Sequence, residues 1–439
     1  MTLIDLSQPT VRAPRLDGLP VAIIGAGPIG LAAAAHLSER GIDFIVFEAG
    51  ASVAASMAAW GHTRLFSPWS LLIDGAAERM LRSTGDWTSP DPDSLPTGSE
   101  VIRDYLAPLS ELAEIKKRIR YSATVTAVSR EGMDRTRSAG RAGRPFVLRI
   151  RDESGTTDLT ARAVIDASGT YSNPNHLSSS GLDPLGWNDV KDAVTHALPD
   201  VLGRDRARFA RRSILVVGAG HSAANTLLAL SRLASSEPGT SITWAIRNPS
   251  AARVSSSDDD QLAARATLGS AVESLVASGL IDKVDSFEID SLRRDEGDVV
   301  VVGRRAGERV ELRVDVVVNA TGFRPDLEML REVRLALDEV VEAPRLLAPL
   351  IDPNVHSCGT VEPHGFLELE HPERDFFIAG MKSYGRAPTF LLATGYEQVR
   401  SIAARLAGDL ESARRVELSL PTTGVCSTDI SPGGSCCDV

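Results

Sequence analysis

Two stretches of the sequence place small residues at the spacing of a phosphate-binding turn. In the first, GAGPIG (25–30), an apolar run comes before the turn and an alanine-rich run follows it. Gly25 allows a tight turn, Gly27 lets the backbone approach a pyrophosphate, and Gly30 lets the helix pack closely on the strand. The N-terminus of that helix adds positive potential. The candidate cofactor contacts here are Gly25, Gly27, Pro28, Ile29 and Gly30.

An acidic residue follows this turn at the distance expected for a ribose contact. The next apolar run, DFIVF (43–47), leads directly into Glu48, 18 residues after Gly30. A carboxylate at this place accepts hydrogen bonds from ribose hydroxyls. The first turn is therefore predicted to bind the ribose diol and pyrophosphate of FAD.

The second turn has the same small residues but a different charge after the next strand. Gly218, Gly220 and Ala223 take the three small-residue positions, and the strand-like run SITWAIRN (241–248) carries Arg247 near its end. A guanidinium can form a fork with a 2′-phosphate that a carboxylate would repel. This turn is predicted to bind NADPH; alternatively, Arg247 is a solvated charge. The candidate contacts are Gly218, Gly220, His221, Ser222, Ala223 and Arg247.

Two further apolar runs set the domain organisation. AVIDASGTYSNPN (163–175) and DVVVNATGFRPD (315–326) each end in small residues, with Gly169 and Gly322 as further cofactor candidates. They bracket the second turn, which is therefore predicted to lie in an inserted domain. The expected α/β fold has two nested Rossmann-like three-layer domains, for FAD and NADPH. The expected segments are 1–172 and 318–420 for FAD, 173–317 (core 211–317) for NADPH, and 421–439 as a flexible cysteine-containing tail.

Composition narrows the function classes. Hydrophobic residues at 43% and a net charge of −11 favour a soluble globular protein and argue against nucleic acid as a partner. The start of the chain has no secretory pattern, and the most apolar run is interrupted by glycines and a proline. Four cysteines do not make a disulfide scaffold. A cytoplasmic protein without membrane contact is expected. RTRSAGRAGRPF (135–146) is predicted to be a mobile basic loop.

With these motifs in place, the chain resembles the flavoproteins that bind two dinucleotides, particularly the flavin-containing and N-hydroxylating monooxygenases. The resemblance rests on the two turns, ASGTYSNP and NATGFRPD, and covers about residues 20–405. It implies that the segment after about residue 375 returns to the FAD, with Gly380 following a strand. It also implies hydride transfer from NADPH to FAD, reaction with O2 to a flavin hydroperoxide, and oxygen transfer to a small soft nucleophile.

The sequence departs from this family at two points. Val190 and Asp192 stand where the monooxygenase linker motif before His196 has Phe and Gly. No C-x-x-C or C-x-x-x-x-C pair, as in disulfide reductases of this fold, is present. Without a neighbouring dithiol, oxygen becomes the expected electron acceptor.

Candidate flavin contacts lie in WGHTRLFSPWSLLID (60–74). Trp60 and Trp69 could wall an isoalloxazine, and Arg64 could stabilise negative charge on the reduced ring. The alternative is a loop packed by its own aromatic side chains.

A second candidate is NVHSCGTVEPHGFLEL (354–369), where Cys358 stands near His356 and His364. A thiol beside an imidazole can be a nucleophile or a ligand for a soft metal. The alternative is a small buried apolar residue. Cys358 and His364 are the catalytic candidates here.

The other three cysteines, Cys426, Cys436 and Cys437, lie in the polar tail. Three thiols on a flexible segment can converge on one soft ion. The tail is also similar to the vicinal pair at the C-terminus of mercuric reductases. An alternative function is therefore an NADPH-dependent flavoprotein of arsenic or mercury resistance, whose tail binds the metalloid. The further alternatives are an incidental tail and a cofactor-binding protein without catalysis.

Overall fold

The apolar run before the first glycine turn forms the central strand of a five-stranded parallel sheet. The computed structural model describes residues 16–250, 263–352, 363–388 and 390–418. The strand order is β16-β7-β1-β2-β3. Parallel strands covered on both faces bury every side chain, as β1, β7 and β16 do. The strands are β1 (Val21–Ile24), β2 (Phe44–Phe47), β3 (Ile119–Arg120), β7 (Ala163–Asp166) and β16 (Phe376–Ile378).

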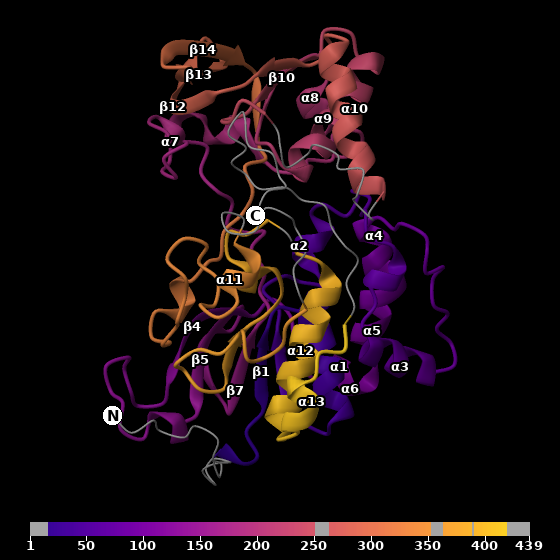
Figure 1. Ribbon diagram of the computed structural model, residues 1–439, viewed down its shortest axis with the longest axis vertical. Coiled ribbons are helices and arrows are strands. Elements are labelled where there is room, and N and C mark those ends of the chain that lie inside the picture. Colours follow the sequence, from indigo (N-terminus) through magenta and orange to yellow (C-terminus); the bar gives the residue numbers. More distant parts are fainter. Residues whose placement is uncertain (1–15, 251–262, 353–362, 389, 419–439) are drawn as a thin grey trace, which may run out of the picture.

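Helices cover one face of this sheet and a second sheet covers the other. Helix α1 (Pro28–Glu39) packs against α12 (Leu392–Ala407) and α3 (Gly75–Ser83) (Figure 1). The run Ala32–Ala35 is fully buried in α1, and its small side chains let these neighbours approach closely. On the other face lie the antiparallel strands β4 (Thr124–Arg130), β5 (Phe146–Asp152) and β6 (Gly155–Ala161).

The second glycine turn lies in a domain built on the same plan. Its parallel sheet has the order β11-β10-β9-β15-β8. Helices α9 (His221–Ser236) and α10 (Ala263–Ala277) cover one face. The antiparallel strands β12 (Phe287–Asp295), β13 (Asp298–Arg305) and β14 (Glu308–Val314) cover the other. The parallel strands are β8 (Val194–His196), β9 (Ser213–Val217), β10 (Ser241–Ala245), β11 (Asp282–Val284) and β15 (Val316–Asn319).

The second domain is inserted into the first. All five strands of its parallel sheet lie in sequence between β7 and β16, which are neighbours in the first sheet. The two domains form separate lobes that the chain joins through two linkers, the first of which includes 173–175 and the second 322–325 (Figure 1). The predicted fold, two nested Rossmann-like three-layer α/β domains, is confirmed.

The two linkers are hydrogen-bonded to each other. The amide of Asn175 donates to the carbonyl oxygen of Gly322 at 2.9 Å, and the side-chain amide of Asn319 donates to the carbonyl oxygen of Asn175 at 2.8 Å. The amide of Arg324 donates to the carbonyl oxygen of Asn173 at 3.0 Å. The linkers therefore run side by side as a short antiparallel pair, with Pro174 bridged to Phe323.

The loop at 135–146, for which mobility was predicted, has one buried contact with a distant part of the first domain. Arg141 in this loop is 5% exposed and forms an ion pair with buried Glu373 at 2.7 Å. Arg130, at the end of β4, pairs with the same carboxylate at 2.8 Å. This ion pair was not predicted, because its carboxylate lies more than 200 residues away in the sequence and the local composition does not reveal it.

Short helices complete the fold, and among the described residues no helix is long and apolar enough to cross a membrane. They are α2 (Ala55–Ala58), α4 (Gly98–Val101), α5 (Ala107–Glu111), α6 (Ala113–Lys116), α7 (Trp187–Val190), α8 (Arg206–Phe209), α11 (Ala348–Ile351) and α13 (Leu410–Arg414).

Candidate functional site: two dinucleotide turns

The three glycines of the first turn each meet a different physical requirement. Gly25 has a φ of +99°, and an added Cβ would lie 2.8 Å from the carbonyl oxygen of Ala167. At Gly30 a Cβ would lie 1.9 Å from the carbonyl oxygen of Gly25. At Gly27 a Cβ would meet nothing within 4 Å. Gly25 and Gly30 are therefore required by packing, whereas Gly27 faces open space that a phosphate group could occupy.

Pro28 and Ile29 follow in this turn, and Ile29 contacts the last chain segment of the first domain. Pro28 is the first residue of α1, where its fixed φ suits a helix start. The Ile29 side chain, 6% exposed, lies under Gly380 and Gly395. Gly380 has a φ of +72°, and an added Cβ would lie 2.9 Å from Ile29 Cγ1. Ile29 and Gly380 therefore hold the end of β16 against the turn.

Glu48 is fixed at the turn by two backbone amides. Its Oε2 accepts a hydrogen bond from the amide of Ala26, and its Oε1 accepts one from the amide of Gly50, both at 2.8 Å. The residue is 9% exposed. Each carboxylate oxygen has a second lone pair, so the fixed carboxylate can also accept hydrogen bonds from a diol.

The second turn repeats this arrangement. Gly218 has a φ of +134°, and an added Cβ would lie 2.2 Å from the carbonyl oxygen of Ala320. Gly220 faces open space, as Gly27 does. Ala223 is fully buried at the third position, where glycine stands in the first turn. The second turn therefore shows the same division between packing positions and an open position as the first.

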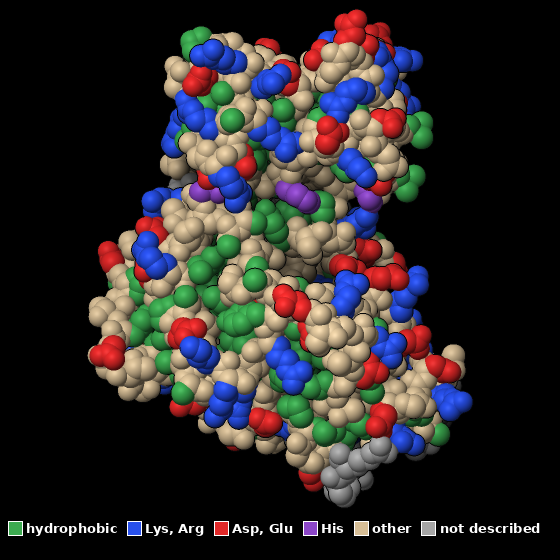
Figure 2. Space-filling view, turned by 180° about the vertical axis from the view of Figure 1, so that it is seen from behind, with side chains coloured by type: hydrophobic (Ala, Val, Ile, Leu, Met, Phe, Trp, Pro, Cys, Tyr) green, Lys and Arg blue, Asp and Glu red, His purple; other side chains and the backbone are tan. Residues whose placement is uncertain are grey.

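The first residues of α9 lie where the two domains meet. The ring of His221 packs against that of Phe66, a residue of the first domain, with 5.2 Å between centroids. Ser222 follows and is half-buried. Figure 2 shows histidine side chains gathered along the constriction between the two lobes. Phe66 was not among the predicted site residues, although it stands within the predicted aromatic loop.

The strand register corrects how the two turns correspond. The amide of Gly25 donates to the carbonyl oxygen of Phe47, and that of Gly218 donates to the carbonyl oxygen of Ala245. Ile246, buried, is therefore the structural counterpart of Glu48. Arg247 lies one residue further and is exposed, with no hydrogen bond or ion pair in the described ranges. The second turn has no carboxylate at the ribose position, and next to that position it has an exposed guanidinium.

Each parallel sheet ends beside its turn in a similar four-residue motif, D-A-S-G or N-A-T-G. In the first, Asp166 Oδ1 accepts hydrogen bonds from the amide and hydroxyl of Ser168, at 3.1 and 2.6 Å. Its Oδ2 accepts one from the Lys382 ammonium at 2.7 Å, and the side chains of this ion pair are 0% and 1% exposed. Lys382 therefore connects the last chain segment to the strand end beside Gly25.

In the second motif an uncharged residue takes the place of Asp166. Asn319 Oδ1 accepts hydrogen bonds from the amide and hydroxyl of Thr321, at 3.2 and 2.6 Å. The glycines that close the two motifs, Gly169 and Gly322, have φ angles of +70° and +97°. These side-chain networks were not predicted. The signal was present in the likeness of the two motifs, which places an Asp or Asn two residues before a Ser or Thr.

The predicted flavin-wall residues have packing roles. Trp69 is 4% exposed and belongs to the core of the first domain. Trp60 is half-buried, and its ring lies 3.0 Å from where a Cβ on Gly98 would stand. Arg64 is exposed and donates a hydrogen bond to the carbonyl oxygen of Leu95. Trp60 and Arg64 thus contact residues outside the loop, and the predicted contacts with a flavin stay a prediction.

His364 lies in a buried polar network behind Gly380. Its Nε2 lies 2.8 Å from the side-chain amide nitrogen of Gln398, and Gln398 Oε1 accepts a hydrogen bond from the amide of Gly380. Its predicted neighbour Cys358 lies outside the described residues, as do Cys426, Cys436 and Cys437. Among the described residues, no group of His, Cys, Asp or Glu could hold a metal ion.

Comparison with known families places the two turns in context. A family model described as pyridine nucleotide-disulphide oxidoreductase matches residues 22–346. The chain belongs to this family. The match includes both glycine turns and both strand-end motifs, and it supports the resemblance to flavoproteins drawn from them.

Curated relatives include monooxygenases and a reductase. The flavin-containing monooxygenase FMO GS-OX-like 2 of Arabidopsis thaliana is 25% identical over 46% of this chain and 45% of its own length. The indole-3-pyruvate monooxygenase YUCCA6 of Arabidopsis thaliana is 29% identical over 47% and 44%. The chain thus spans less than half the length of these monooxygenases. A ferredoxin–NADP reductase of Granulibacter bethesdensis is 26% identical over 77% and 80%.

Solved structures agree on the fold. The bacillithiol disulfide reductase of Bacillus cereus has a TM-score of 0.65 at 21% identity, covering 89% of this chain and 99% of its own. The FAD-bound cadaverine monooxygenase of Erwinia amylovora has a TM-score of 0.64 at 14% identity, covering 94% and 99%.

Proposed function

We propose that this protein is an FAD-dependent, NADPH-oxidising monooxygenase that transfers oxygen to a soft nucleophilic atom of a small molecule. Membership of an oxidoreductase family and the monooxygenase names of two relatives support the reaction class. The observation that carries the cofactor assignment is the contrast between the two turns: a fixed carboxylate at the first, and an exposed guanidinium at the second.

The first turn suits FAD. Glu48 is held so that both oxygens can accept further hydrogen bonds, and Gly27 leaves room for a pyrophosphate beside the N-terminus of α1. Bound FAD would accept a hydride equivalent and react with O2, which is the redox chemistry that the polypeptide lacks. The chain would bind and orient it.

The second turn suits NADPH. Gly220 leaves room for a pyrophosphate at the N-terminus of α9, and Arg247 can donate to a 2′-phosphate. The buried apolar Ile246 at the ribose position adds no negative charge that would repel that phosphate. Because His221 of this turn contacts Phe66, the domain proposed to bind NADPH meets the first domain at the loop predicted to contact the flavin.

A reductase that passes electrons to another acceptor is the second candidate. It is supported by the ferredoxin–NADP reductase, which matches 77% of this chain and 80% of its own length, far more than the monooxygenases do. The alternative of arsenic or mercury resistance has no support from the relatives, and its tail cysteines lie outside the described residues.

The formation of an oxygenated product separates the two candidates. The purified protein should contain FAD, oxidise NADPH faster than NADH, and consume O2 as it does so. Added amine and thioether substrates should raise the rate and appear as oxygenated products. A protein that reduces ferredoxin or an artificial carrier rapidly, with no oxygenated product from any such substrate, would be a reductase.

A further inference from the structure

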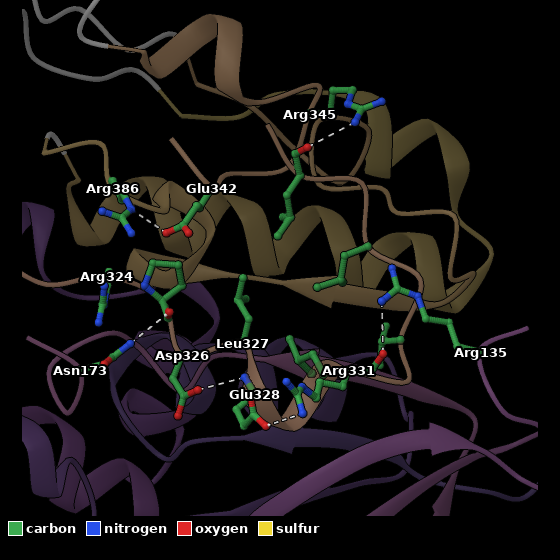
Figure 3. Close-up of a pocket in the computed structure, with 15 residues that line it drawn as sticks. Arg135, Asn173, Arg324, Asp326, Leu327, Glu328, Arg331, Glu342, Arg345 and Arg386 are labelled. Atoms are coloured by element: carbon green, nitrogen blue, oxygen red, sulfur yellow. Dashed lines mark hydrogen bonds and ion pairs between the residues drawn. The ribbon is translucent and has the colours of Figure 1, made fainter. Parts of the chain in front are cut away.

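A cavity of about 640 Å³ opens beside the second linker, apart from both dinucleotide turns. Most of its wall comes from 324–345, the segment that begins in this linker, and the rest from Arg135, Asn173 and Arg386 (Figure 3). No residue of either glycine turn lines it, nor does Glu48 or Arg247. The proposed cofactors leave this cavity without an assigned occupant.

Positive charge prevails in the lining. Arg331 pairs with Glu328 at 3.2 Å and Arg386 with Glu342 at 2.7 Å. Asp326 is the one further acid of the lining. The three remaining arginines have no carboxylate partner for their guanidinium groups among the described residues: Arg135 and Arg345 donate to backbone carbonyls, and Arg324 to the His176 ring.

This excess of cations is notable in a chain of net charge −11. A cavity that concentrates one sign of charge raises the local concentration of the opposite ion. Arginine forks suit carboxylates and other planar or tetrahedral oxyanions.

The floor of the cavity is apolar. Leu330 and Val333 line it and are each 1% exposed, because they belong to the core between the first sheet and β4–β6. Leu335 and Leu337 continue this surface. A cavity of this volume, which combines these apolar side chains with eight charged ones, has room for a small organic anion.

The lining also touches both linkers. Asn173 belongs to the first linker, and its side-chain amide donates to the carbonyl oxygen of Pro325 in the second at 3.2 Å. Arg324, also in the second, donates its amide to Asn173. Any occupant would therefore contact the two segments that join the domains.

We propose that this cavity binds a small organic carboxylate with an apolar body, as an effector that acts through the linkers. The arginines would bind the carboxylate and the leucines would bury the body. Since the nucleotide turns do not line the cavity, the effector and NADPH would bind together.

Isothermal titration of the FAD-loaded full chain tests the site without relying on the proposed activity. Octanoate is the probe, and octanol is its uncharged analogue. Octanoate should bind with one site per chain and should not be displaced by NADP⁺, whereas octanol should bind at least about tenfold more weakly. Arg345→Gln, an exposed position, should lower octanoate affinity about tenfold or more.

The matched control is Arg149→Gln. Arg149 is an exposed arginine of β5, paired with Asp158 away from the cavity, and its loss should leave octanoate affinity unchanged. Equal affinity in the two variants, displacement by NADP⁺, equal binding of octanol, or no octanoate binding would each overturn the site. If octanoate binds as expected but leaves the KM and turnover for NADPH unchanged, the effector role is wrong.

Discussion

At the scale of single residues, the glycines of each turn separate a packing requirement from a binding requirement. Gly27 has an ordinary φ of −79° and open space where a Cβ would stand. Gly27→Val should therefore fold, but its side chain would occupy the space that a pyrophosphate needs. We expect colourless protein with a melting temperature close to that of the FAD-free wild type, measured by calorimetry and visible absorbance.

Gly30→Val is the control for this prediction. Its Cβ would lie 1.9 Å from the carbonyl oxygen of Gly25, so the helix and the turn must separate. We expect this variant to lose folded protein as well as FAD. If Gly27→Val retains FAD, the turn does not bind the pyrophosphate.

Arg247 gives a second prediction at this scale. If its exposed guanidinium binds a 2′-phosphate, Arg247→Ala should raise the KM for NADPH about 10- to 100-fold, which corresponds to the loss of a charge-assisted hydrogen bond. The KM for NADH should change little. Steady-state kinetics with both nucleotides measures these KM values. An equal rise in KM for NADPH and NADH would show that Arg247 does not bind the 2′-phosphate.

The sequence predicts some of these residues and not others. The glycines and Glu48 follow from local spacing, because a tight turn and a ribose contact each need a particular residue type near the turn. Lys382 and Phe66 do not follow, because they meet Asp166 and His221 only after distant segments fold together. The prediction also placed the counterpart of Glu48 at Arg247, one residue beyond Ile246. The hydrogen-bond register between the strands sets that position, and the register is not visible in the sequence.

At the scale of elements, the buried Asp166–Lys382 pair connects β7 to the segment after β16. Lys382→Met leaves a buried carboxylate without its cation, which costs about 3–5 kcal/mol when one partner of such a pair is lost. We expect that loss in the free energy of unfolding, measured by denaturant titration.

Adding Asp166→Asn to Lys382→Met should recover most of this loss, because no buried charge remains and the amide oxygen can still accept from Ser168. Asn319 shows the uncharged form of this motif in the second domain. If the double variant has the same free energy of unfolding as Lys382→Met alone, the lysine side chain stabilises the fold through its packing and not through its charge.

His371 makes the stability of the first domain depend on pH. Burial of its ring lowers the pKa to about 4, and its Nδ1 accepts a hydrogen bond from the amide of Ala336, which a proton there would prevent. The unfolded chain binds the proton near pH 6.5, so stability is full above that pH and falls as pH drops toward 4. Between pH 7 and pH 5 the loss should be about 2 kcal/mol.

His371→Gln should remove this part of the pH dependence, since an amide oxygen can accept the same hydrogen bond without titrating. Denaturant titrations at the two pH values compare the variant with the wild type. An unchanged pH slope in the variant would show that other groups cause it.

At the scale of the whole molecule, the nested arrangement was predictable because the chain shows each domain's glycine turn and each strand-end motif in order. The contact between the two lobes was not predictable from the sequence. It depends on contacts such as that of His221 with Phe66 and on the hydrogen bonds between the linkers. The arginine-lined cavity beside those linkers was not predictable either, because its walls come from four separate segments.

The central claim is that one chain brings NADPH at its second turn to FAD at its first and passes the electrons to oxygen. The most direct test mixes the purified, FAD-loaded protein with NADPH or NADH without oxygen, follows the visible flavin absorbance, and then admits air. The account predicts rapid bleaching by NADPH, much slower bleaching by NADH, and recovery of the oxidised spectrum on aeration. Equal bleaching by both nucleotides, or a reduced flavin that stays bleached in air, would contradict it.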